Sequence, residues 1–276
     1  MELAQNAAKI KAAGLGLAAI SYDSPAVLKT FSDRQKIGFP LLSDPQSKTI
    51  REYGILNEQA AKDTPAYGVP YPGIYILDAR GIVTAKYFES DYKERDSTGL
   101  VLLRQFGIEP ETPHASQRSK HLTITTSATA AQVRPSLKLE LVAEVAMDPR
   151  VHVYAPGVEG YIPISWTQAD SAAWKSSETQ FPASRTMRLE AIHETVPVFD
   201  GTFRLRRELV IADEKSVRPL LDAAGNLVIE GSIRYQACDD QQCFLPTTVP
   251  AKWSLPFHGL DRTRVPAELQ RKPQGQ

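Results

Sequence analysis

Tyr235-Gln236-Ala237-Cys238-Asp239-Asp240-Gln241-Gln242-Cys243-Phe244-Leu245-Pro246 is the stretch that holds both cysteines of this 276-residue chain. Four residues separate the two cysteines, so a tight loop can bring their sulfurs together. The chain has no other thiol that could pair with either of them. Any redox chemistry of the chain's own side chains is therefore expected at Cys238 and Cys243.

The short spacing bears on whether the pair is structural or redox-active. Closing a loop of about six residues removes only about 2 kcal/mol of unfolded-state entropy, against roughly 3 kcal/mol for a loop of about 15 residues. A bridge here stabilises little, and short or exposed bridges are readily reduced and exchanged. We favour a redox-active pair, with a structural disulfide and unpaired or metal-binding thiols as the alternatives.

The residues before the cysteines alternate between apolar and polar side chains. This period-two pattern predicts a half-buried strand. If the alternation continues, Cys238 falls among the polar positions, and its sulfur faces water at the strand end, where another protein's thiol could reach it. The apolar positions are Leu227, Ile229, Ile233 and Tyr235.

Composition and spacing exclude several other classes of function. The 32 basic and 32 acidic residues balance, which argues against a nucleic-acid or anionic-membrane surface. A helix that spans a bilayer needs about 20 apolar residues in a row, and no apolar run in this sequence approaches that length. We therefore expect no membrane insertion. Zinc needs three or four protein ligands, but the histidines are scattered singly, so we expect no metal site. We also expect no other cofactor. The histidines are His114, His121, His152, His193 and His258.

The pattern of the chain predicts two domains joined by a linker. Residues 1–108 alternate between helical and strand patterns, which is typical of an α/β layer fold. Residues 109–120 are rich in proline and serine and predict a solvated linker. Residues 121–260 contain repeated alternating runs that predict a β-sandwich. The polar residues 261–276 predict a loosely ordered tail.

Within the first domain, the expected helices are one before Gly14, one over 24–36 and one over 100–106. The expected strands are residues 15–20, 73–77 and 82–87, the last two joined by a turn at 78–81.

The stretch 235–246, with Thr247-Thr248-Val249-Pro250 after it, resembles the end of the N-terminal periplasmic domain of the thiol:disulfide interchange protein DsbD. Arg150–Tyr154, Phe181-Pro182 and the run from Val198 to Leu205 extend the resemblance, which covers about 121–258. It implies an immunoglobulin-like sandwich with a redox cysteine pair, a thioredoxin-like redox partner and a location in the bacterial periplasm. The loop between the cysteines can be one residue longer in that family.

The same resemblance implies an aromatic residue that shields the cysteines and moves aside when the partner docks. By position this residue is Phe199, and Tyr154 is the matching candidate on the facing strand; for both, the alternative is an ordinary core aromatic. Asp239 and Asp240 lie between the cysteines, where negative charge disfavours a thiolate and raises the cysteine pKa. The alternative for this acidic pair is a solvated turn.

The segments 18–24, 39–44 and 68–78 resemble the peroxiredoxin and redoxin (AhpC/TSA) branch of the thioredoxin fold. The resemblance implies a cis-proline before the strand Ile74–Leu77, for which Pro72 is the candidate and Pro70 the second choice; a plain trans-proline is the alternative. The reactive cysteine of that family lies at the N-terminus of the first long helix, but no cysteine occurs in this chain before Cys238.

The missing cysteine limits what the first domain can do. We expect this chain not to be a peroxidase by that family's mechanism. Its first domain is expected to be an incomplete thioredoxin-like module with a docking or structural role, or one whose first strand, reactive thiol and export signal lie upstream of Met1.

The expected architecture is therefore α/β plus all-β, an incomplete thioredoxin-like domain followed by an immunoglobulin-like β-sandwich. The leading hypothesis is a thiol:disulfide oxidoreductase in which a thioredoxin-like partner attacks Cys243 and Cys238 resolves the mixed disulfide. A non-enzymatic binding module with a structural disulfide is the alternative. In a third possibility, the sandwich re-reduces an upstream redoxin cysteine within one polypeptide.

Overall fold

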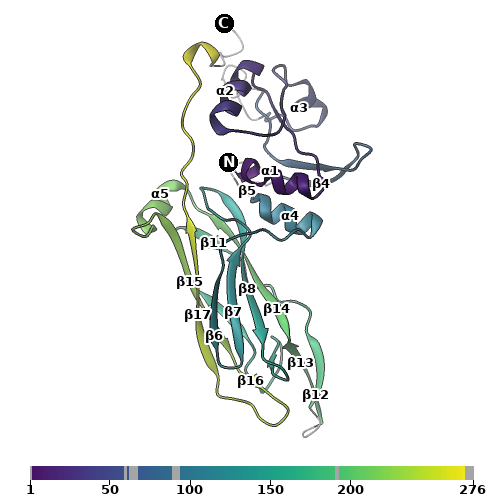
Figure 1. Ribbon diagram of the computed structural model, residues 1–276, viewed down its shortest axis with the longest axis vertical. Helices are drawn as coiled ribbons and strands as arrows, with labels where there is room; N and C mark the ends of the chain where they lie inside the picture. The colour runs from purple at the N-terminus through teal and green to yellow at the C-terminus, as the bar shows by residue number, and fades with distance from the viewer. Residues whose placement is uncertain (1, 59–60, 62–67, 89–93, 190–192, 271–276) are drawn as a thin grey trace. The chain divides into compact units, whose positions relative to one another are not determined.

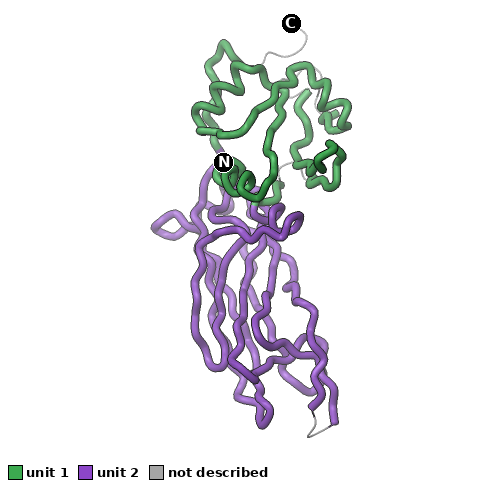
Figure 2. Tube along the Cα trace, turned by 45° about the vertical axis from the view of Figure 1, so that its right-hand side comes forward, with its two compact units in different colours: residues 1–98, 261–276 green, residues 99–260 purple. Residues whose placement is uncertain are grey.

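A computed structural model describes residues 2–58, 61, 68–88, 94–189 and 193–270 of the chain. The residues form two compact units, one of residues 1–98 with 261–276 and one of residues 99–260 (Figure 2). The division comes before the predicted end of the first domain at 108. Asp261 accepts hydrogen bonds from Arg34 and Gln35 at 2.8 and 2.9 Å, so the start of the predicted polar tail belongs to unit 1.

Unit 1 contains helices and two separate two-stranded sheets, one parallel (β1–β2) and one antiparallel (β3–β4). The three expected helices and the strand pair around the 78–81 turn are present, whereas the first strand is shorter than expected. Ser24 caps α2 by accepting the Val27 N–H, as a serine before a helix commonly does. The elements from the start of the chain are α1 (Glu2–Ala12), β1 (Ala19–Ser21), α2 (Pro25–Gln35), β2 (Leu41–Ser43), α3 (Lys48–Glu52), β3 (Ile74–Leu77), β4 (Val83–Tyr87), β5 (Arg95–Asp96) and α4 (Thr98–Phe106), which runs into unit 2.

Unit 2 is built from antiparallel strands in three sheets, with strand orders β11-β14-β8-β7-β6, β10-β15-β17 and β12-β13-β9-β16 (Figure 1). The prediction that strands dominate this part of the chain is confirmed, while the immunoglobulin-like topology stays an expectation. The strands are β6 (Ala115–Ser119), β7 (Leu122–Ala128), β8 (Leu137–Met147), β9 (His152–Tyr154), β10 (Ser165–Gln168), β11 (Trp174–Ser176), β12 (Arg185–Leu189), β13 (Glu194–Asp200), β14 (Thr202–Ile211), β15 (Asn226–Tyr235), β16 (Ala237–Cys238) and β17 (Thr247–Pro256). Short helices α5 (Glu214–Val217), η1 (Arg218–Leu220) and η2 (Ala267–Leu269, in unit 1) complete the set.

One hydrophobic core joins the three sheets of unit 2, and we call it the main core. In β17 every second side chain is buried, as the period of a half-buried strand requires. Trp253 of β17 stacks on Trp166 with ring centroids 4.9 Å apart, and its indole N–H donates to the Ser127 carbonyl of β7 at 2.8 Å. The stacking joins β17 to β10 of its own sheet, and the hydrogen bond ties β17 to β7 of another sheet.

Part of the predicted linker is a strand. β6 pairs antiparallel with β7 from Ala115↔Thr126 to Ser119↔Leu122. Four of its five side chains are exposed, because β6 lies at the edge of its sheet, so its composition matches that of a solvated linker. Polar sequence alone therefore did not distinguish an edge strand from a loop.

Candidate functional site

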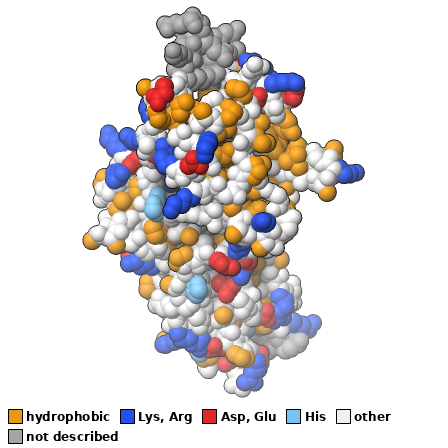
Figure 3. Space-filling model, turned by 45° about the horizontal axis from the view of Figure 1, so that its top comes forward, with side chains coloured by type: hydrophobic (Ala, Val, Ile, Leu, Met, Phe, Trp, Pro, Cys, Tyr) orange, Lys and Arg blue, Asp and Glu red, His pale blue; other side chains and the backbone are white. Residues whose placement is uncertain are grey.

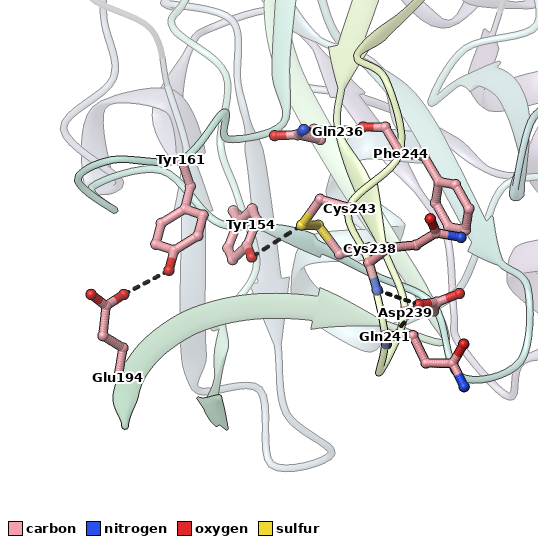
Figure 4. The surroundings of a disulfide bond; sticks show 10 residues. Tyr154, Tyr161, Glu194, Gln236, Cys238, Asp239, Gln241, Cys243 and Phe244 are labelled. Carbon is pink, nitrogen blue, oxygen red and sulfur yellow. Dashed lines mark hydrogen bonds between the residues drawn. A yellow bond between two sulfur atoms is a disulfide. The ribbon is translucent and has the colours of Figure 1, made fainter. Parts of the chain in front are cut away.

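Cys238 and Cys243 form a disulfide with an S–S distance of 2.08 Å and a Cα–Cα distance of 4.0 Å (Figure 4). Cys238 is the last residue of β16, the two-residue strand that pairs with β9, and lies directly opposite His152. The Phe244 N–H donates to the Ala237 carbonyl at 2.8 Å, which holds the two arms of the cysteine hairpin together. The predicted approach of the two sulfurs is present in the structure.

Asp239 organises the turn between the cysteines. Its carboxylate accepts the backbone N–H groups of Gln241 and Gln242, both at 2.8 Å, and its own N–H donates to the Gln242 carbonyl at 2.9 Å. These two backbone donors lower the pKa of Asp239. Asp239 is thus a turn-forming residue with a fixed negative charge, whereas Asp240 is exposed.

The two sulfurs differ in environment. Cys238 is 1 % exposed, while Cys243 is an exposed residue. The prediction that the Cys238 sulfur faces water is therefore wrong. Its side chain does point away from the main core, as the alternation required, but that side of the sheet is covered by other side chains.

The covering side chains form a small cluster on the outer face of the sheet β12-β13-β9-β16, and we call it the site cluster. On β9, Val153 belongs to the main core, whereas Tyr154 belongs to the site cluster, as alternation along a strand requires. The buried members are Tyr154, Val196, Val198 and Cys238, and the partly buried ones are Val158, Tyr161, Met187 and Leu189.

Tyr154 contacts the disulfide directly. Its hydroxyl lies 3.6 Å from Cys243 Sγ (Figure 4), and it must donate, because a disulfide sulfur carries no hydrogen. Tyr154 is 1 % exposed, and burial raises its pKa. The structure thus places this candidate residue against the cysteines, and a phenol O–H aimed at a sulfur can also stabilise the thiolate of the reduced state.

Tyr161 is a second aromatic at the site that the sequence analysis missed. Its ring lies 4.3 Å from that of Tyr154, centroid to centroid, and its hydroxyl donates to Glu194 at 2.6 Å. That hydrogen bond raises the pKa of Tyr161 to about 12. Tyr161 follows Gly157 and Gly160, so an aromatic in a glycine-bearing loop next to β9 was the available signal.

Phe199 does not lie at the cysteines, so its assignment as the shielding aromatic is corrected. It is 4 % exposed in the main core and stacks on Phe203, with ring centroids 4.8 Å apart. In the sheet register Phe199 faces Val153, whereas its neighbour Val198 faces Tyr154. A one-residue difference in strand parity therefore separates a core residue from the site cluster.

The candidate cis-proline of the first domain is also corrected. All peptide bonds of the described residues are trans, including those before Pro72 and Pro70. The trans form is the lower-energy state of an X-Pro bond unless surrounding contacts impose the other.

In the described residues no three His, Cys, Asp or Glu side chains group as metal ligands. No helix among those residues is both long enough and apolar enough to cross a membrane.

Two protein families match different parts of the chain. Residues 1–86 match the AhpC/TSA family, and residues 120–252 match the family described as thiol:disulfide interchange protein DsbD, N-terminal. The second match contains the whole of β9, β13, β15 and β16 and both cysteines.

Relatives of the first segment are peroxiredoxins by name. A Mycobacterium tuberculosis protein whose name places it among the peroxiredoxins is 38 % identical over 76 residues, which are 27 % of this chain and 48 % of the relative. Peroxiredoxin Bcp of Escherichia coli K12 is 28 % identical over 104 residues, 36 % of this chain and 62 % of the relative. The chain thus spans about half to three fifths of the length of these relatives.

Solved structures similar to the chain include the N-terminal periplasmic domain of ScsB from Proteus mirabilis. It is 17 % identical, with a TM-score of 0.34, and the match covers 52 % of this chain and 51 % of that one. The reduced N-terminal domain of DsbD from Neisseria meningitidis is 11 % identical, with a TM-score of 0.27, over 41 % of this chain and 75 % of that one. The two predicted resemblances are confirmed: the chain combines a segment similar to the AhpC/TSA family with one similar to the N-terminal domain of DsbD.

Proposed function

We propose that the chain exchanges disulfides with a thioredoxin-like protein through Cys238 and Cys243. The observation that carries the proposal is the asymmetry of the bridge, in which Cys243 is an exposed residue and Cys238 is 1 % exposed. An incoming thiolate can reach Cys243 Sγ, whereas Cys238 Sγ is covered. The DsbD-like segment supports a redox role for this pair.

The exposed sulfur is the point of attack. A partner thiolate attacks Cys243 Sγ, the partner–Cys243 bond forms, and the Cys243–Cys238 bond breaks with Cys238 leaving as a thiolate. A second partner thiol then attacks the partner's own sulfur and releases Cys243. The partner dithiol becomes a disulfide, and two electrons and two protons pass to the two cysteines. The reverse sequence oxidises this chain, with Cys238 as the resolving thiol.

Apolar surface beside Cys243 supports docking of a protein partner. Leu245 is 85 % exposed two residues after Cys243. Phe244, between them, is half-buried and stacks on His121 at 3.9 Å, centroid to centroid. Acidic and basic side chains are interspersed on the face that Figure 3 shows, and the chain is neutral overall. Contact through Leu245 with little charge steering fits a chain without net charge.

We place this exchange in the bacterial periplasm because of the DsbD-like segment. Disulfides persist in such oxidising compartments. Unit 1 is proposed as a docking or structural module rather than a peroxidase, because residues 1–237 contain no cysteine.

A structural role for the bridge in a binding module is the second candidate. The burial of Cys238 favours it, since a packed sulfur resists exchange. Replacing both cysteines by serine separates the two functions. Loss of exchange with retained folding supports the redox role, whereas a large fall in melting temperature with persistent partner binding supports the structural one.

Trapping of a mixed disulfide tests which cysteine is attacked. The Cys238→Ser variant leaves the exposed Cys243 and should accumulate a stable mixed disulfide with oxidised glutathione, which releases reduced glutathione, or with a thioredoxin that lacks its resolving cysteine and carries a thionitrobenzoate leaving group on the other. The matched Cys243→Ser variant leaves only the buried Cys238 and should react far more slowly under native conditions. Equal trapping by the two variants would contradict the proposal.

A further inference from the structure

His152 is a buried titratable side chain beside the disulfide that the proposed exchange does not yet use. It is 2 % exposed, and neither ring nitrogen has a hydrogen-bond partner in the described part of the chain. A buried polar atom without a partner costs free energy, so such a group in a native fold calls for an explanation. Its place next to Cys238 supplies one.

The sheet register puts His152 at the centre of a row of three side chains. On one side β16 places Cys238 directly opposite His152, and on the other β13 places Asp200 opposite it. Residues directly opposite have Cβ atoms about 4.5–5.5 Å apart and point to the same face. Tyr154, two residues along β9 on that face, packs edge-on against the imidazole at 5.6 Å, centroid to centroid.

Two carboxylates near Cys238 are engaged by hydrogen-bond donors. The Asp200 carboxylate accepts from Arg185 Nε at 3.0 Å, and the Asp239 carboxylate accepts two backbone N–H groups. The Tyr154 hydroxyl is directed at Cys243 Sγ. Since Cys238 is 1 % exposed, its proton cannot pass directly to water. Among the described residues, His152 is the neighbour with free nitrogen atoms.

The charges around His152 keep it ready to accept a proton. Burial and the Arg185 guanidinium lower the pKa of His152, while the carboxylates of Asp240, Asp200 and Asp239 oppose that effect. The imidazole is therefore neutral at pH 7. A neutral imidazole has one nitrogen that accepts and one that donates.

We propose that His152 is the general base that takes the proton of Cys238 when the disulfide closes. This inference rests on the proposed exchange. In the mixed disulfide, the Cys238 S–H gives its proton to His152, the Cys238 thiolate attacks Cys243 Sγ, and the S–S bond forms. The partner leaves as a thiolate and takes the proton from the imidazolium. In the opposite direction, the His152 N–H stabilises Cys238 as the leaving thiolate.

The rate of ring closure tests the proposal. The reduced full chain is mixed with saturating oxidised glutathione, so that the unimolecular attack of Cys238 on the Cys243–glutathione disulfide limits the reaction. In His152→Phe, which keeps a flat ring without a proton acceptor, closure at pH 7 should slow by about 10²-fold. Its rate should then rise about tenfold per pH unit, because the fraction of Cys238 thiolate rises by that factor below the thiol pKa.

A matched control and a second measurement keep the test decisive. His121→Phe changes a histidine near the cysteines that stacks on Phe244 and should leave closure unchanged. In the unsubstituted protein, histidine NMR should give different pKa values for His152 in the reduced and oxidised forms, since the two groups titrate as a coupled pair only when the thiol exists. Equal closure rates and pH profiles in the two variants, or identical His152 titration, would overturn the role of His152. Absence of glutathione exchange in the unsubstituted chain would instead overturn the proposed function.

Discussion

The two faces of the sheet β12-β13-β9-β16 use the same strands for different purposes. One face places Val153, Phe199 and Ala237 in the main core. The other places Tyr154, Val198 and Cys238 in the site cluster. Along β9 and β13 the assignment changes with every residue, so neighbours in the sequence differ in role.

This difference shows how a site is added to a β-fold without weakening its core. The main core draws on strands of all three sheets, whereas the site cluster has only four buried members. The main core stabilises the fold of unit 2, and the site cluster covers the sulfur of Cys238. Changes on the core face should therefore act on stability, and changes on the outer face should act on redox chemistry.

Phe199 and its neighbour Val198 give the sharpest contrast. Phe199→Ala should destabilise unit 2 by about 3–5 kcal/mol, because it leaves a cavity beside Phe203. Urea unfolding followed by tryptophan fluorescence reports unit 2 alone, since Trp166, Trp174 and Trp253 all lie there. The reactivity of Cys243 in the folded variant should be unchanged. A large change in that reactivity would break the separation of the two faces.

His152 should make the stability of unit 2 depend on pH. Its folded-state pKa lies below the ordinary 6.5, so the unfolded state binds the proton more tightly. Stability is therefore full above about pH 6.5 and falls as the pH drops, by at most about 1.4 kcal/mol per unit for one proton. His152→Phe should flatten this slope between pH 6.5 and the lowered pKa. An unchanged slope would show that His152 does not titrate as a buried group.

Tyr154→Phe should alter the thiol more than the fold. Loss of one hydroxyl donor costs about 1 kcal/mol of stability. Removal of the donor 3.6 Å from Sγ should raise the pKa of the reduced Cys243 thiol, because its thiolate loses a hydrogen bond. Alkylation rate against pH measures that pKa. Tyr161→Phe, which loses only the bond to Glu194, is the matched control and should show the smaller shift.

Leu245→Ser should have the smallest effect on the fold, within about 0.5 kcal/mol, because the side chain is 85 % exposed. It should weaken exchange with a thioredoxin through a higher KM and leave the reaction with glutathione unchanged. Equal loss with both substrates would argue against a docking role.

Periodicity and residue resemblance predicted the cysteine hairpin, the half-buried strands of unit 2 and the place of Tyr154 beside the cysteines. They did not predict the burial of Cys238, because β15 ends at Tyr235 and the chain passes at Gln236 to a different sheet, where the outer face is covered. Tyr161 and Glu194 reach that face from a loop and from the start of β13, a long-range contact that alternation does not encode.

Phe199 was misassigned because position in a motif does not specify strand parity. His152 was seen only as an isolated histidine, since its relation to Cys238 exists only in the register of β9 and β16. The edge strand β6 escaped prediction because it buries almost no side chains.

The reduction potential of the Cys238–Cys243 bridge decides whether the pair exchanges electrons or is a structural disulfide. The full chain is equilibrated over a graded series of dithiol and disulfide ratios, and the two thiols are counted by alkylation and mass. We expect a single two-electron transition between about −270 and −120 mV, the range of exchange proteins. A bridge that remains oxidised at a poise below about −300 mV, where structural disulfides resist reduction, would contradict it.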